Sequence, residues 1–532
     1  MSAPGDDTRA PRKTLEDPPL LLLAALLMAV FMLSRLPFFW YYPSVHTSQD
    51  TPGYLEVVTS IREGHWPHFI YRTPGYPLFF WFVTLFTNRW MAVVCAQNLL
   101  SYASSLFLVY SVRCYRPSLA LPAALAMCGF LGSSQVVLYD VALLSESLYT
   151  TTIIVSVALF LAAFRRFDAA PLALASAAMA CCIFVRPAGQ YFLPIYAGIA
   201  GYLVLRRVPF RSVAAFLLPF PALLVSLCAY NYATLSSPAI SPFAEASLVG
   251  ATALFWEPDP RLPDSVNQAL KDLPASYARQ DITPEDLQAV RTSWDVDRLN
   301  PIYEKAIARM VFSEGWGWGR LGSGDYFRSR ANMRAVSLIA IRRHPILYAK
   351  FFWVGLVEYY RGVGFKFDIE SAIANREQGN LLYGMSGAHP DQVAARLAAA
   401  SKGAAPGSDP RDAAARSSQE RLVRGLQHLW QRLHAAVFQN TAWSFAYFTV
   451  LILSTVQLAR HRGRHDGAFL MVVLTLIPLG ASFVICLVQS PTDRYSYPTQ
   501  FIYYLCVALS PLLWLKRNDS PPQASPPCAP AS

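Results

Sequence analysis

Long runs of apolar residues constrain this chain more than any other feature of its sequence. Ten segments approach or exceed the roughly 18 to 20 residues with which a helix crosses a bilayer. They are predicted at about 20–39, 90–112, 119–138, 143–164, 170–186, 190–206, 212–233, 437–458, 467–489 and 495–515. Only 15% of the residues are charged, compared with about 25% in average soluble domains. The sequence therefore predicts an all-α polytopic membrane protein with about 10 (10–12) transmembrane helices.

Basic residues give the bundle its predicted orientation. The net charge is +11, and small basic groups lie between the apolar runs, at Arg113 and Arg116, Arg165 and Arg166, Arg206 to Arg211, Arg460 to Arg464, and Lys516 and Arg517. Lys and Arg mark cytoplasmic loops of membrane proteins, so these connectors and both termini are expected in the cytoplasm. The chain has no broad basic stripe interleaved with aromatic residues, so nucleic acid is not an expected partner.

The remaining segments give the predicted domain organisation. It consists of a cytoplasmic segment at 1–19, a transmembrane module of seven spans at 20–233 with a first outer loop at 40–89, an outer region at 234–436, three further spans within 437–515, and a Pro-rich cytoplasmic tail at 516–532.

Three stretches within this organisation need separate treatment. Thr73–Thr87 and Pro345–Tyr360 are apolar but only about 15 residues long, which favours helices at the membrane interface over full spans. The Ala/Ser/Gly-rich stretch at about 385–420 is typical of a flexible insert.

Asp50 stands out in the first outer loop, which carries two Pro-Gly turns, HTSQDTPGY and YRTPGYP. Burial close to a bilayer disfavours ionisation of a carboxylate and suits it to act as a base. The alternative is a helix N-cap, because Asp before Thr-Pro-Gly can accept bonds from free backbone amides.

Arg72, Arg186 and Arg494 are predicted at the outer ends of separate helices. The planar guanidinium fork binds phosphate in a bidentate way. The alternative is that an arginine at a span end extends its charged group to the membrane–water interface without binding a ligand. Glu146 lies at the start of the fourth span. Charges at membrane depth are often functional, but a carboxylate at a helix start is also favoured by the helix dipole.

Several short motifs occur in an order that resembles a known family. They are Asp50, Tyr54 and Gly64 followed by RTPGYPLFF, then LLSESLY, CCIFVRPAGQYFLP, RRHPILYAKFF and DRYSYPTQFIYYL. Together they resemble the polyprenyl-phosphate-sugar-dependent glycosyltransferases of the GT-C fold, which include protein mannosyltransferase and aminoarabinose-transferase relatives.

The resemblance implies a GT-C-like bundle with interfacial helices in the first outer loop and a periplasmic domain between spans 7 and 8. It implies that Asp50 is the catalytic base and that the three arginines hold the phosphate of the lipid. It also makes Tyr54, Tyr76, Glu146 and Tyr495 candidates for contacts with the acceptor or the sugar.

The expected function is transfer of a hexosyl or pentosyl group from a polyprenyl-phosphate donor to a lipid, glycan or protein acceptor. The site would face the periplasm of a bacterial inner membrane. Two alternatives stay open: a flippase or other transporter for lipid-linked sugars, and a noncatalytic partner in envelope polysaccharide assembly. A transporter typically places polar groups near the middle of the membrane, whereas the candidates here gather at outer helix ends.

No cofactor is expected. His46, His65 and His68 make a small cluster in the outer loop, but they form no firm ligand motif. Relatives that use diphosphate donors carry an acidic metal motif, and Asp50 has no neighbouring acid. This difference favours a metal-independent reaction with a monophosphate donor.

Overall fold

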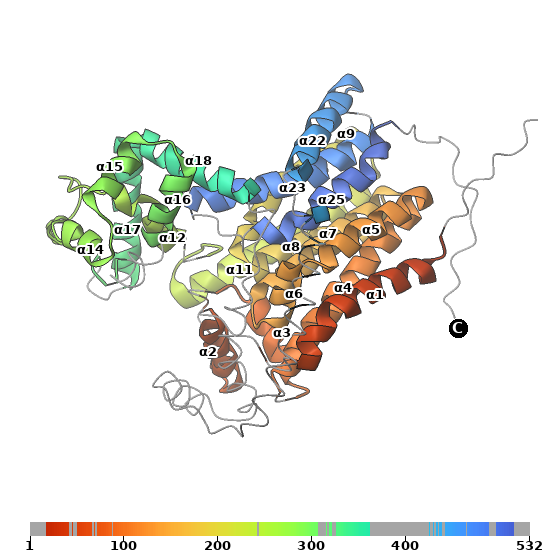
Figure 1. The fold of residues 1–532 in the computed structure, drawn as a ribbon, viewed down its shortest axis with the longest axis horizontal. Helices are drawn as coiled ribbons and strands as arrows, with labels where there is room; N and C mark the ends of the chain where they lie inside the picture. The colour runs from red at the N-terminus through yellow and green to blue at the C-terminus, as the bar shows by residue number, and fades with distance from the viewer. Residues whose placement is uncertain are drawn as a thin grey trace, which may run out of the picture.

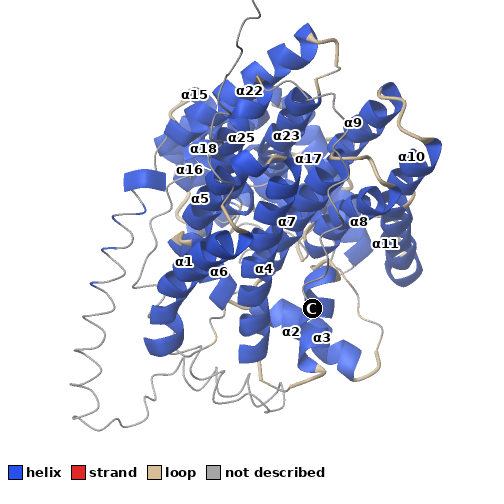
Figure 2. Ribbon diagram, turned by 90° about the vertical axis from the view of Figure 1, so that its right-hand side faces the viewer, coloured by secondary structure: helices blue, strands red, loops and turns tan. Residues whose placement is uncertain are grey.

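The regular structure of this chain is helical. The computed structural model describes residues 18–41, 45, 50–65, 67, 69, 72–87, 89–241, 244–306, 315–316, 319–321, 326–361, 425, 429, 432, 434, 436–438, 442–463, 465–488 and 496–514. Figure 1 shows a large helical bundle with a smaller group of helices, α12 to α18, at its left, and Figure 2 shows no strand among these residues. The predicted insert at about 385–420 and the predicted tail at 516–532 lie outside them.

The helices of the first half of the chain build most of the bundle. Their bounds are α1 Leu20–Tyr41, α2 Thr51–Arg62, α3 Gly75–Thr84, α4 Met91–Tyr115, η1 Pro117–Leu119, α5 Ala120–Leu131, α6 Ser134–Val141, α7 Ser145–Phe164, α8 Ala169–Val185, η2 Pro187–Tyr191, α9 Phe192–Leu205, α10 Phe210–Leu217 and α11 Pro219–Leu235.

The second half of the chain supplies an outer domain and the last spans. Its helices are α12 Ala244–Thr252, η3 Ala253–Phe255, α13 Asp264–Leu270, α14 Leu273–Arg279, α15 Pro284–Thr292, α16 Val296–Lys305, α17 Tyr326–Arg343, α18 Pro345–Arg361, α22 Ala442–Arg460, α23 Asp466–Val488, η6 Tyr497–Thr499, α25 Gln500–Leu509 and η7 Ser510–Leu513.

Six helical segments in the described part of the chain are long and apolar enough to cross a membrane. They contain α4, α7, η2 with α9, α10 with α11, α22 and α23, and a bent pair made by α5 and α6 adds a seventh candidate. The chain is therefore an all-α, multi-pass membrane protein.

Two of the predicted spans are broken, and a third is a short unbroken helix. The segment predicted at 119–138 bends by 65° between α5 and α6, after Gly132 and Ser133. The segment predicted at 170–186 is the 17-residue α8, and the segment predicted at 495–515 contains the ten-residue α25 between two 3₁₀ turns. Proline explains these last breaks, because Pro498 and Pro511 lack the N–H that an α-helical bond needs.

The first outer loop folds back onto the ends of the spans. The Thr51 hydroxyl donates to the carbonyl of Leu143 (3.1 Å), and the Thr73 hydroxyl donates to the carbonyl of Val185 (2.9 Å). Ten residues of α3 rise about 15 Å, half of the roughly 30 Å hydrocarbon layer. The loop is therefore fixed beside the outer ends of α7 and α8, at the lower end of the bundle in Figure 1.

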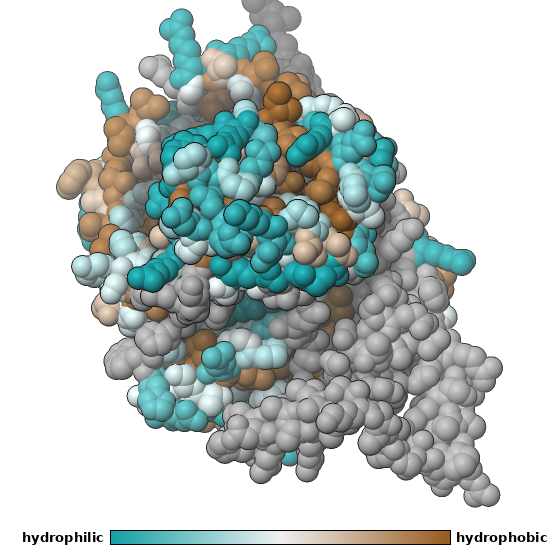
Figure 3. All heavy atoms as spheres, turned by 90° about the vertical axis from the view of Figure 1, so that its left-hand side faces the viewer, coloured by the Kyte–Doolittle hydropathy of each residue, from teal (hydrophilic) through white to brown (hydrophobic). Residues whose placement is uncertain are grey.

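The outer domain contains α12 to α17 and has its own hydrophobic core, which includes Leu254, Trp256, Tyr303 and Trp316. Local signals define its helices: Thr283 and Asp286 form a reciprocal capping box at the start of α15. Figure 3 shows that the face of this domain turned away from the bundle is largely hydrophilic.

Helix α18, which corresponds to the predicted interfacial helix at 345–360, joins the domain to the bundle. On one side, buried Lys350 donates to the carbonyl of Arg291 near the end of α15 (2.7 Å). On the other side, the Phe352 ring lies 5.2 Å from the Phe483 ring of α23. The domain is thus attached to the end of α23 that is remote from Asp466.

Candidate active site at the outer helix ends

Asp50 precedes α2 but does not cap it. It occupies the N-cap position, yet its side chain accepts no capping bond from the helix. One carboxylate oxygen, Oδ1, instead lies 2.6 Å from Nη2 of Arg72, and both side chains keep about a quarter of their surface exposed (23% and 27%). Of the two interpretations of Asp50, the structure disfavours the helix cap and gives the carboxylate a cationic partner.

The two Pro-Gly turns explain how the pair forms. A Cβ at Gly53 would lie 3.2 Å from Nε of Arg72, so the absence of a side chain there lets the guanidinium lie along α2. A Cβ at Gly75 would lie 2.7 Å from the carbonyl oxygen of Phe184, so this turn can sit tightly on the end of α8. The Arg72 guanidinium also lies 4.9 Å from the centre of the Tyr54 ring, within cation–π range.

Glu146 and Arg186 form a second, deeper ion pair. The Glu146 side chain is fully buried in the first turn of α7, and its Oε1 lies 2.5 Å from Nη1 of Arg186, which is 13% exposed. Arg186 follows α8 in an extended conformation. A buried carboxylate needs such a partner, because desolvation of an unpaired charge is costly.

Tyr54 and Ser145 connect the two ion pairs. The Tyr54 hydroxyl lies 2.8 Å from Oγ of Ser145, and this oxygen lies 3.4 Å from both Oε2 of Glu146 and Nη1 of Arg186. Burial, followed by the charge of Glu146, raises the pKa of Tyr54, so its hydroxyl stays protonated and able to donate. Two acids and two arginines from four segments thus belong to one polar network.

Tyr76 lies behind this network. Its ring contacts the Tyr54 ring edge-on at 4.7 Å, and its fully buried hydroxyl donates to Oε1 of Gln97 (2.8 Å). A contact between Tyr76 and a substrate stays a prediction. Arg494 and Tyr495 lie outside the described residues, so their predicted contacts with substrate stay predictions as well.

Sequence reasoning missed two features of this region. Ser145 connects the ion pairs; it stands in the LLSESLY motif, but only Glu146 of that motif was given a role from the sequence. Arg35 forms a buried ion pair with Asp140, and its Nε also donates to Oδ1 of Asn98 (2.9 Å). The signal available was a basic residue inside the first apolar run. The almost fully buried pair connects α1 to α6, and the bond to Asn98 connects α1 to α4.

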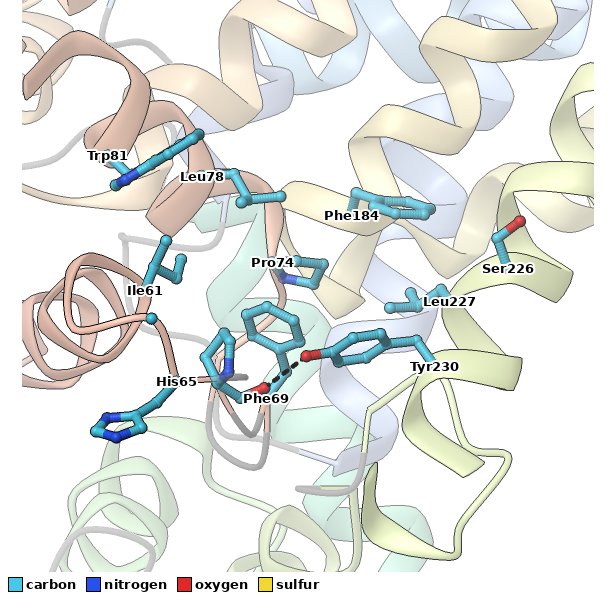
Figure 4. Close-up of a pocket in the computed structure, with 12 residues that line it drawn as sticks. Ile61, His65, Phe69, Pro74, Leu78, Trp81, Phe184, Ser226, Leu227 and Tyr230 are labelled. Carbon is cyan, nitrogen blue, oxygen red and sulfur yellow. Dashed lines mark hydrogen bonds between the residues drawn. The ribbon is translucent and has the colours of Figure 1, made fainter. Parts of the chain in front are cut away.

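An apolar groove of about 480 Å³ begins next to the network, within the roughly 300–1,000 Å³ of typical ligand pockets. Figure 4 shows its lining, with Pro74, Leu78 and Trp81 on one side and Phe184, Leu227 and Tyr230 on the other. We call it the α3–α11 groove. Pro74 and Phe184, which line the groove, are each two residues from an arginine of the network in the sequence.

The described residues contain no group of three or more His, Cys, Asp and Glu side chains placed to hold a metal ion. Of the three histidines in the outer loop, His46 and His68 lie outside the described residues, and His65 is exposed. The absence of a metal from this cluster therefore stays a prediction.

Comparisons with known proteins give one weak structural likeness. Neither a family model nor a curated protein sequence matches this chain. The crystal structure of an oligosaccharyltransferase from Archaeoglobus fulgidus in the apo form aligns with 92% of this chain at a TM-score of 0.35 and 11% sequence identity. The alignment covers 49% of that protein, so this chain spans about half its length.

Proposed function

We propose that this chain is a membrane glycosyltransferase of the GT-C type, which transfers a sugar from a polyprenyl-phosphate donor to an acceptor at the outer face of the membrane. The observation that carries the proposal is the polar network at the outer helix ends. It holds the Asp50–Arg72 and Glu146–Arg186 pairs together through Tyr54 and Ser145.

The residues of this network match the needs of the reaction. Asp50 takes the proton from an acceptor hydroxyl, and the resulting oxygen attacks the anomeric carbon of the sugar. The bond between that carbon and the phosphate oxygen breaks, and the polyprenyl phosphate leaves with the bonding electrons. General-base assistance of this kind contributes typically about 10²–10⁴-fold, and a single displacement inverts the anomeric centre.

Arg72 and Arg186 are placed to stabilise the leaving phosphate. A guanidinium has five N–H donors in a planar fork, so each arginine can contact a phosphate without giving up every bond to its carboxylate. Stabilising charge that develops on a leaving group is usually the largest contribution to such catalysis. Glu146 keeps Arg186 in place as the positioning residue of the deeper pair.

The α3–α11 groove supports a lipid-linked donor. Its lining is apolar and lies on helices at the outer edge of the bundle, where Leu78 and the neighbouring Val225 are themselves exposed. A prenyl chain in this groove would bring its phosphate to Arg72 and Arg186. As part of the proposal, we place this face at the periplasmic side of a bacterial inner membrane.

The test is sugar transfer in reconstituted membranes. Purified wild type, Asp50→Asn and Glu56→Gln are compared with donors that carry radiolabelled sugar on polyprenyl phosphate; Glu56 is an exposed acid on the same helix and serves as the matched control. We expect transfer by wild type and Glu56→Gln and none by Asp50→Asn at equal membrane insertion. Full activity of Asp50→Asn would refute the role of Asp50, whereas wild-type protein that moves intact donor across the bilayer without transfer would establish the transporter alternative.

A further inference from the structure

Gln97 lies near the start of α4, and its side chain is buried behind the polar network. Its amide oxygen accepts a hydrogen bond from the hydroxyl of Tyr76 on α3 (2.8 Å). Its amide nitrogen donates to the main-chain carbonyl of Ala142, which follows α6 (2.8 Å). The carbonyls of Tyr139 and Asp140 lie further from this nitrogen, at 3.4 and 3.3 Å. One buried amide therefore bonds the first outer loop on one side and the link between α6 and α7 on the other.

The chemistry of these partners fixes the direction of the bonds. A main-chain carbonyl can only accept a hydrogen bond, so the NH₂ end of the Gln97 amide must face the three carbonyls. The oxygen end is then left for Tyr76, whose hydroxyl must donate its proton to it. Because the Tyr76 side chain is fully buried, this proton is engaged within the protein.

The bond to Tyr76 holds the outer-loop half of the network. The Tyr54 ring contacts the Tyr76 ring edge-on at 4.7 Å, and it also lies 4.9 Å from the Arg72 guanidinium. Arg72 stands four positions before Tyr76 in the same loop. A shift of the Tyr76 ring would therefore displace the Tyr54 ring and the guanidinium that lies on it.

The bonds to the carbonyls hold the other half of the network. Two residues after Ala142, Ser145 and Glu146 begin α7. Glu146 forms the ion pair with Arg186. The position of the link between α6 and α7 therefore sets where Glu146 lies and, through it, where Arg186 lies. Gln97 connects this link to the segment that carries the other arginine.

Given the proposed function, on which this inference rests, we propose that Gln97 is a positioning residue that sets the spacing of Arg72 and Arg186, so that both contact the same donor phosphate. The phosphate acquires a second negative charge as its bond to the sugar breaks, so the alignment of the two arginines matters most at that point. A misplacement of about 1 Å can lower a rate about 10²-fold. In the proposed function the prenyl chain binds in the α3–α11 groove, so loss of alignment should lower kcat more than it raises KM for the donor.

Two substitutions remove bonds of Gln97, and a third is the matched control. Gln97→Met keeps the length of the side chain but bonds neither the Tyr76 hydroxyl nor the carbonyls. Tyr76→Phe removes one hydroxyl and nothing else. Tyr102→Phe removes a hydroxyl from the same helix as Gln97, but that hydroxyl donates to the carbonyl of Ala24 on α1 (3.1 Å) and not to the outer loop or the link.

The experiment measures sugar transfer at varied concentrations of labelled donor, with each full-length variant in the same reconstituted membranes. Rates are expressed per folded, inserted molecule, and thermal unfolding is recorded in parallel. We expect Gln97→Met to lower kcat on the order of 10- to 10²-fold with little change in KM for the donor. Tyr76→Phe should lower kcat by a smaller factor, because it leaves the bonds to the carbonyls in place, and Tyr102→Phe should match wild type.

A double variant tests whether the two residues act through one bond. Gln97→Met and Tyr76→Phe each remove the bond between the amide oxygen and the hydroxyl, so together they should lower kcat by less than the product of their separate effects. A loss of kcat in Tyr76→Phe with a wild-type kcat in Gln97→Met would show that the Tyr76 hydroxyl meets the substrate itself, and this result would overturn the inference.

The remaining outcomes separate this inference from the proposed function. Wild-type kcat in both single variants, with or without a loss of thermal stability, would make Gln97 a purely structural residue and leave the glycosyltransferase intact. Absence of transfer by the wild type would overturn the proposed function and the role of Gln97 with it. If Gln97→Met does not insert into the membrane, equal kcat values for Tyr76→Phe and Tyr102→Phe would refute the positioning role.

Discussion

The Asp50 carboxylate and the Arg72 guanidinium lie 2.6 Å apart, although 22 positions separate the two residues in the sequence. Each residue stands immediately before a Thr-Pro-Gly turn, and each threonine is bonded to the end of a span. In this state the proposed base is paired with one of the proposed phosphate ligands. The arrival of a donor phosphate at Arg72 would therefore weaken the hold of the arginine on Asp50 and prepare the base for the acceptor.

Replacement of Arg72 tests its role toward the phosphate. We expect Arg72→Gln to lower kcat/KM for the donor on the order of 10²-fold, the usual cost of removing one donor to a developing negative charge. Arg89→Gln is the matched control, because Arg89 is an exposed arginine of the same loop. Steady-state transfer at varied donor concentration measures both. Equal values for Arg72→Gln and wild type would exclude a contact between Arg72 and the phosphate.

Asp50→Asn should separate binding from chemistry. Without its carboxylate partner, Arg72 is free to pair with phosphate, so affinity for polyprenyl phosphate should rise while transfer is lost. An ion pair as exposed as this one is worth about 0.2–1 kcal/mol, which corresponds to at most about a fivefold change in Kd. Equilibrium binding of labelled polyprenyl phosphate to purified wild type and Asp50→Asn gives the two Kd values. Weaker binding by Asp50→Asn would contradict the competition between carboxylate and phosphate.

The sequence predicts the bundle well where an apolar run is continuous. The spans expected at 90–112, 143–164 and 467–489 correspond to α4, α7 and α23. It predicts less well where a run contains a break that hydropathy ignores. The bend after Gly132 and the 3₁₀ turns around α25 arise from backbone bonding and not from side-chain polarity.

The site was predictable as a set of residues but not as a set of partners. Position alone pointed to Asp50, Arg72, Glu146 and Arg186, because each is a charge beside a span. The pairing of each acid with its arginine depends on how the first outer loop packs against α7 and α8. This packing is fixed by hydrogen bonds such as that from the Thr73 hydroxyl to the Val185 carbonyl. Arg35 lies within an apolar run, so its charge is easy to notice in the sequence. Its buried partner, Asp140, is 105 positions away, and no local sequence pattern predicts that pairing.

Loss of the Glu146 charge should destabilise the protein as well as impair it. Glu146→Gln leaves Arg186 largely buried without a matching charge, and breaking a buried pair in this way costs about 3–5 kcal/mol. Replacing both partners, as in Glu146→Gln with Arg186→Met, should recover part of that loss, because no unpaired charge remains. Thermal unfolding in detergent measures stability for the single and double variants. If the double variant were less stable than Glu146→Gln, Arg186 would contribute to stability through contacts other than its charge pairing with Glu146.

Gly75→Ala should misplace the loop without touching a charged group. The added Cβ would lie 2.7 Å from the Phe184 carbonyl oxygen and 2.8 Å from the Val185 amide nitrogen. Both are backbone atoms that cannot rotate away, so α3 must shift from the end of α8. Arg72 lies three residues before Gly75 and would move with it. We therefore expect transfer to fall at least tenfold while insertion into the membrane is retained.

Gly198→Ala is the matched control for this substitution. Gly198 lies within α9, and a Cβ there would meet no atom within 4 Å. Because alanine is a better helix former than glycine by about 1 kcal/mol, this variant should be at least as stable as wild type and fully active. Transfer and thermal unfolding are measured for both variants in the same membranes. If Gly75→Ala were as active as Gly198→Ala, the close contact between the Gly75 turn and α8 would not be what positions Arg72. The pairing of Asp50 with Arg72 would then need another explanation.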